Sequence, residues 1–65
     1  MNETQQLAEL KQQIASTFQQ REAIKQAIEN ETLSAKQGLH QLEPIDKKLS
    51  ELDLKFKELW DRQQS

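Results

Sequence analysis

The most regular pattern of apolar and polar positions in this chain lies between Pro44 and Trp60. Apolar residues recur there at alternating spacings of four and three, and Asp, Lys, Ser and Glu fill the positions between them. On a helix this spacing gathers the apolar side chains on one narrow stripe, whereas a strand would need a period of two. The stretch is predicted to be an amphipathic helix that packs against a partner. Its stripe consists of Ile45, Leu49, Leu52, Phe56 and Leu59.

The N-terminal half carries a seven-residue repeat. Glutamine doublets occupy 5–6, 12–13 and 19–20. If the first Gln of each doublet takes heptad position f, positions a and d of the coiled-coil repeat contain mostly apolar residues, with Thr17, Arg21 and Glu31 as exceptions. Phe18 rotates back onto the same stripe in an ordinary 3.6-residue helix. We predict a helix over about 3–29 with its glutamines in solvent. Its apolar seam is Leu7, Leu10, Ile14, Phe18, Ile24 and Ile28.

Residues 30–33 are predicted to form a turn between two helices. Asn30 tolerates the left-handed conformation that often ends a helix, and Ser34 offers an N-cap with Gln37 three residues later. Short loops join antiparallel neighbours, so the chain is predicted to be all-α, a coiled-coil-like antiparallel helical hairpin formed by a single unit, 1–65. The alternative of one long rod would need an apolar seam through 29–35, where the sequence is polar.

The second arm contains two residues that disfavour a helix. Gly38 weakens it, and Pro44 removes one backbone hydrogen bond and pushes Glu43 away from helical geometry. We expect a break or a kink at 42–44, with the break slightly favoured. The arm would then consist of a helix over about 34–42, with Ala35, Leu39 and Leu42 facing inward, and a helix over about 44–63 that starts at the proline.

The position of the turn predicts which residues face each other across the hairpin. Leu7 would lie opposite Phe56, Phe18 opposite Ile45, and Ile28 opposite Ala35. Arg21, which interrupts the apolar stripe of the first arm, would meet Leu42 and Glu43. We expect Arg21 and Glu43 to form an ion pair that sets the register. The alternative is that the stem of Arg21 packs while its head reaches solvent.

Length and composition favour self-association. The chain has 65 residues, of which 34% are hydrophobic and 31% charged, and it contains no cysteine. Chains of this size enclose little core and usually add disulfides, a metal or a second copy. The absence of cysteine removes disulfides and thiolate metal sites, so a homodimer that forms a four-helix bundle is expected.

The sequence does not suggest an enzyme. A two-helix chain offers no cavity of its own, and a Gly-rich phosphate loop is absent because Gly38 is the single glycine. His40 and Glu43 would bind a metal only if a dimer axis supplied a second such pair, and a surface histidine near a turn is the simpler interpretation. We therefore expect no catalytic, cofactor-binding or metal-binding residues.

Charge argues against nucleic acid and membrane partners. The net charge is −2, and Asp and Glu alternate with Lys47, Lys48 and Lys55 in the most basic stretch. The N-terminal segment is neither basic nor continuously apolar, which predicts a cytoplasmic protein without a signal peptide. In size and plan the chain resembles the Rop-type plasmid regulators, in which two helical hairpins form a four-helix bundle that binds RNA. This architectural resemblance involves no motif and assigns no residue a role.

The expected function is contact with other proteins through helical-bundle surfaces, as an adaptor, assembly factor or small regulator. Leu54 points away from the stripe of the second arm and Trp60 lies at its edge, so these two residues are predicted to bind a partner at the open end of the hairpin. One alternative is an RNA- or DNA-binding bundle of Rop type. Another is a co-folding chaperone whose exposed seam is completed by a different protein.

Overall fold

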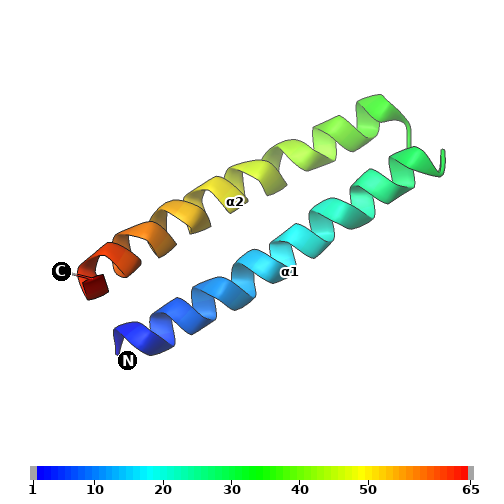
Figure 1. Ribbon diagram of the computed structural model, residues 1–65. Helices are drawn as coiled ribbons and strands as arrows, with labels where there is room; N and C mark the ends of the chain where they lie inside the picture. The colour runs from blue at the N-terminus through cyan, green and yellow to red at the C-terminus, as the bar shows by residue number, and fades with distance from the viewer. Residues whose placement is uncertain (1, 65) are drawn as a thin grey trace.

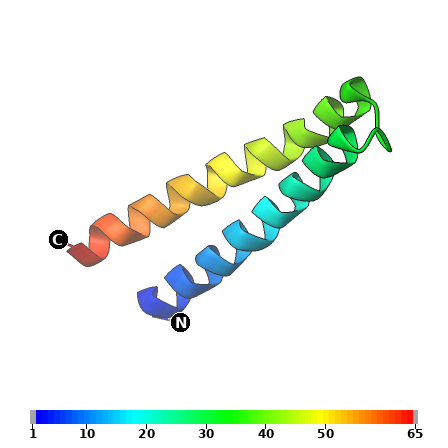
Figure 2. The ribbon, with the colours of Figure 1, turned by 45° about the vertical axis from the view of Figure 1, so that its right-hand side comes forward.

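The computed structural model describes residues 2–64, which form two antiparallel helices lying side by side (Figure 1). Helix α1 spans Glu3–Glu29 and helix α2 spans Ala35–Gln64. The start of α1 and the end of α2 lie at one end of the pair, here called the open end, and the connecting loop forms the tip at the other, as the turned view confirms (Figure 2). The hairpin measures 47 × 16 × 15 Å. The all-α hairpin predicted from the sequence is confirmed.

Polar side chains cap the start of both helices. The Asn2 side chain accepts a hydrogen bond from the backbone N–H of Gln5 at 2.8 Å, which satisfies one of the amides that a helix start leaves without an internal partner. The Ser34 hydroxyl accepts from the N–H of Gln37 at 3.2 Å in the same way. The predicted N-cap at Ser34 is therefore confirmed.

The tip ends α1 with a left-handed residue one position later than predicted. Asn30 has φ −85° and ψ 1°, whereas Glu31 has φ 61°. The N–H of Glu31 donates to the carbonyl of Ile28 at 3.1 Å, and the N–H of Thr32 donates to the carbonyl of Ala27 at 3.0 Å. This pair of bonds is the Schellman arrangement, which needs a left-handed residue immediately after the helix cap. Glu31 is the residue that adopts this left-handed conformation.

Replacing Glu31 with glycine is expected to stabilise the hairpin. A residue with a Cβ atom pays a steric penalty in the left-handed region that glycine does not, and the greater freedom of glycine in the unfolded chain offsets part of the gain. We expect Glu31→Gly to raise the free energy of unfolding by about 0.5–1 kcal/mol. Urea titration should show a higher midpoint. Glu29→Gly, inside the last turn of α1, is the control and should lower it.

The predicted break at 42–44 is wrong, because α2 continues through Pro44 without interruption, and the alternative of a kink stays a prediction. Pro44 is exposed, so its ring meets no neighbouring helix, and water can reach the His40 carbonyl that would otherwise accept the missing hydrogen bond. Leu42 and Ile45, on either side of the proline, are both partly covered. Packing of these two residues holds the helix on α1 across the defect.

The apolar core is thin. Leu7 and Leu52, each 6% exposed, are the buried hydrophobic residues of the part of the chain that the structure describes. Thr17 is the buried polar residue, and its hydroxyl donates to the Gln13 carbonyl at 2.7 Å, so burial leaves the hydroxyl satisfied. Most of the predicted seam is only partly covered, namely Leu10, Ile14, Ile24, Ile28, Ile45, Leu49, Phe56 and Leu59.

Gly38 brings the two helices close together near the tip. It is buried, and a Cβ atom built on it would overlap the Ile28 side chain. Glycine costs a helix interior about 1 kcal/mol relative to alanine. At this position the absence of a side chain makes room for Ile28, so the residue that weakens the helix also lets it pack.

The two helices pair about one turn out of the predicted register. Ile28 contacts Gly38 instead of lying opposite Ala35, and Arg21 pairs with Asp46 instead of Glu43, a shift of three residues in both cases. In the loop, the Leu33 N–H donates to the Ala27 carbonyl at 3.2 Å, and the Leu33 side chain lies beside Gly38.

The shifted register changes which side chains face inward. Thr17, and not Phe18, is buried in its turn of α1, and Phe18 remains 49% exposed. Near the tip Gly38 takes the inward position, while Leu39 is 65% exposed and Ala35 is also exposed. The predicted inward placement of Phe18, Leu39 and Ala35 is therefore wrong for the single hairpin.

Candidate interaction surface

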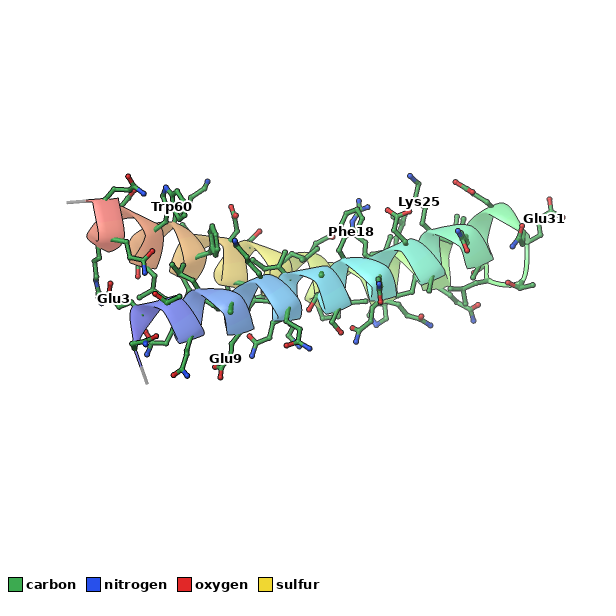
Figure 3. All side chains as sticks on the ribbon, turned by 60° about the horizontal axis from the view of Figure 1, so that its bottom comes forward. Glu3, Glu9, Phe18, Lys25, Glu31 and Trp60 are labelled. Carbon is green, nitrogen blue, oxygen red and sulfur yellow. The ribbon has the colours of Figure 1, made fainter. Side chains whose placement is uncertain are left out.

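One side of the hairpin carries a row of aromatic side chains. The rings of Phe56 and Trp60 are stacked, with centroids 6.2 Å apart and an interplanar angle of 13°. The Lys11 ammonium of α1 lies 5.9 Å from the centre of the Phe56 ring. Phe18 points to the same side as Trp60, and Glu9 points to the opposite side (Figure 3). We call Lys11, Phe18, Phe56 and Trp60 the aromatic flank.

The aromatic flank leaves large apolar surfaces in water. Trp60 is 45% exposed and Phe18 49%, although each sits beside the seam and not on the outer side of its helix. Large aromatic side chains contribute much of the energy of protein interfaces, and an exposed row of them beside a thin core is typical of a contact surface. The flank therefore has the composition of an interface.

Charged side chains continue the aromatic flank towards the tip. Arg21 Nε donates to Asp46 Oδ1 at 2.9 Å, and Arg21 Nη1 lies 3.7 Å from Glu22 Oε1. The predicted Arg21–Glu43 pair is thus replaced by Arg21–Asp46. The predicted and the observed pair both link the two helices through Arg21, and the one-turn register shift explains the change of partner.

The Arg21–Asp46 pair is expected to stabilise the hairpin weakly. Both side chains are substantially exposed, 36% and 52%, so water and salt screen their attraction. A double-mutant cycle on Arg21→Ala and Asp46→Ala should give a coupling energy of about 0.3–1 kcal/mol. The same cycle on Arg21→Ala and Glu43→Ala is the control. Equal coupling in the two cycles would contradict the observed register.

The opposite side of the hairpin is polar. Two shallow grooves there are lined by the second residue of each glutamine doublet and by basic residues of α2 that recur every seven positions. We call this surface the glutamine flank. It contains Gln6, Gln13, Gln20, Lys48, Lys55 and Arg62. Glu9 and Glu58 line the same grooves, so carboxylates separate the cations.

The structure does not bring Leu54 and Trp60 onto one surface. Leu54 is 60% exposed, but six residues of helix place it about 120° around α2 from Trp60, on the side away from α1. The predicted role of both residues in partner binding stays a prediction. Trp60 belongs to the aromatic flank and Leu54 lies apart from it, so separate substitutions can test the two.

The chemistry of the remaining candidates is simple. His40 and Glu43 line a shallow hollow on α2 together with the exposed Leu39. Between residues 2 and 64 no group of three or more His, Cys, Asp or Glu side chains could hold a metal ion. Neither α1 nor α2, as described, contains a stretch long and apolar enough to cross a membrane.

Comparison of the chain with protein-family models, with curated proteins and with solved structures finds no match. The surface must therefore be interpreted from its own residues. Sequence reasoning missed Lys11 of the aromatic flank and also Asp46, which continues the flank towards the tip. A signal was present, because 11, 18 and 25 in α1 and 46, 53 and 60 in α2 recur at seven residues, next to the seam positions.

Proposed function

We propose that this protein is a non-enzymatic protein–protein interaction module that acts through helical-bundle contacts, as an adaptor, assembly factor or small regulator. The observation that carries the proposal is the aromatic flank, where Phe18 and Trp60 stay about half exposed beside a core with few buried residues. Further helices packed on this flank would cover both rings and thicken the core. The cysteine-free sequence suits action in the cytoplasm.

Two sources can supply those helices. A second copy would give a homodimeric four-helix bundle, and a different protein would make the chain a co-folding chaperone or subunit. In both cases the hairpin uses the same surface, the aromatic flank. The Rop-type alternative, binding of RNA or DNA, would draw on Lys47, Lys48 and Lys55, of which Lys48 and Lys55 lie on the glutamine flank beside Glu9 and Glu58. Carboxylates at this spacing weaken the attraction for phosphates, so we favour a protein partner.

The test compares two variants of the tagged protein. Phe18→Ala combined with Trp60→Ala removes both exposed rings of the flank, and Leu54→Ala removes an even more exposed apolar side chain elsewhere on α2. Self-association is measured by sedimentation velocity, capture of host proteins by affinity purification, and helical content by circular dichroism.

We expect the flank variant to lose its contacts, with itself or with a captured protein, while it keeps its helical content. The Leu54→Ala variant should keep its contacts and its helical content. Contacts that survive loss of the flank but disappear in Leu54→Ala would move the site to the outer side of α2. If neither variant changes any contact, the proposal is wrong.

A further inference from the structure

Two contacts between α1 and α2 show how charged and apolar residues alternate along the aromatic flank. Lys11 lies over Phe56, which places it between Asp53 and Trp60 of the antiparallel helix. Arg21 pairs with Asp46, so Lys25, one turn further towards the tip, lies between Asp46 and Leu39. Beside the aromatic rings, Lys11 and Lys25 thus form a basic row on α1, and Asp46 and Asp53 form an acidic row on α2. Phe18, Lys25 and Trp60 point to one side of the hairpin (Figure 3).

Two charged rows of opposite sign make this surface complementary to itself. A two-fold axis parallel to the helices would set α1 of one copy against α2 of the other, with both tips at the same end. Lys11 would then face Asp53 of the second copy, and Lys25 would face Asp46. Lys11 would also approach the exposed Trp60 ring, which attracts cations.

The other symmetric arrangement opposes like charges. A two-fold axis across the helices would put α1 against α1 and α2 against α2, with the tips at opposite ends. Lys11 would then face Lys25, and Asp46 would face Asp53. Like charges set against each other across an interface disfavour that pairing.

We propose that the aromatic flank is covered by a second copy of this chain, in a dimer whose two tips lie at the same end. This inference rests on the proposed function and adds its partner and its geometry. The flank is two helices wide along a hairpin 47 Å in length, which is a footprint close to the roughly 800 Å² per partner of stable interfaces. Asp46 and Asp53 remain 52% and 58% exposed in their intrachain pairs, so their oxygens can accept a second partner.

Distance measurement between the tips distinguishes the two arrangements. The chain has no cysteine, so Lys36→Cys introduces a single labelling site at the start of α2, where the side chain is exposed. Helix axes in a bundle lie about 8–10 Å apart, and spin labels in the proposed dimer should therefore be about 20–30 Å apart. Tips at opposite ends would give a distance close to the 47 Å length of the hairpin.

Charge reversal gives a second, independent readout. Lys25→Glu would face Asp46 in the proposed dimer and should raise its Kd about five- to tenfold at low salt, since two such contacts occur per dimer. In the opposite arrangement the same substitution would face Lys11 and lower the Kd. Lys47→Glu makes the same change of charge away from the flank and is the control.

The outcomes separate this inference from the proposed function. A dimer with a short tip distance and a raised Kd for Lys25→Glu supports both. A dimer with a long tip distance, or one tightened by Lys25→Glu, overturns the inference and leaves the interaction module intact. A monomer that still captures another protein through Phe18 and Trp60 overturns the inference alone. A monomer without any flank-dependent contact overturns both.

Discussion

Leu52→Ala is expected to unfold most of the protein. Leu52 is 6% exposed and is the buried hydrophobic residue of α2, facing a core whose other such member is Leu7. Truncation of a buried leucine to alanine costs about 2–5 kcal/mol, because apolar contacts are lost and a cavity remains. A core of this size supplies no more than about 3–5 kcal/mol in total. The substitution therefore removes most of the available stability.

Leu54→Ala is the matched control for this experiment. It makes the same chemical change in the same helix, two residues away, but Leu54 is 60% exposed. We expect Leu54→Ala to lower the free energy of unfolding by less than about 1 kcal/mol. Urea unfolding followed by circular dichroism should be carried out at one fixed chain concentration, because self-association raises the apparent stability. Equal destabilisation by the two variants would show that Leu52 does not form the core.

Pro44→Ala is expected to stabilise the hairpin by about 2 kcal/mol, because proline in a helix interior costs about 3 kcal/mol and its stiffening of the unfolded chain returns part of that. The alanine N–H can donate to the His40 carbonyl, and the exposed site has room for the change. The expected result is a higher urea midpoint. Glu43→Ala, the neighbouring exposed position, should change it by only a few tenths of a kcal/mol.

The proline experiment also tests the continuity of α2. If the chain broke at 42–44, Pro44 would occupy the first turn of a new helix, a position that suits proline. Alanine would then add no stability to the folded helix, and it would remove the restriction that proline places on the unfolded chain, so the protein would become less stable. A lower midpoint for Pro44→Ala would therefore contradict the continuous helix Ala35–Gln64.

The hydrophobic periodicity was sufficient to predict the hairpin, because the spacing of apolar residues determines both helices and a polar stretch separates them. The N-cap of α2 could also be predicted, since Ser34 followed by Gln37 is a local signal. The continuity of α2 could not be predicted from local sequence, because it depends on Leu42 and Ile45 packing on α1 across Pro44. This tertiary packing outweighs the local tendency of proline to break the helix.

The register was the part that local patterns could not determine. It depends on how the loop folds, with Glu31 left-handed and Leu33 turned back towards Gly38. Gly38 looked like a weakness in the sequence and is a point of close helix contact in the fold. The resulting shift moves Arg21 from Glu43 to Asp46 and leaves Phe18 on the surface. The aromatic flank consequently becomes visible only when the two helices are placed together.

Self-association of the unmodified chain is the most direct test of the claim that the hairpin needs further helices to complete its fold. Sedimentation equilibrium at micromolar concentration should show a species of twice the chain mass, with Trp60 fluorescence shifted to the blue as its ring, 45% exposed in the single hairpin, leaves water. Dilution should lower the stability together with the dimer fraction. A monomer that unfolds cooperatively, with a midpoint independent of concentration, would contradict the claim.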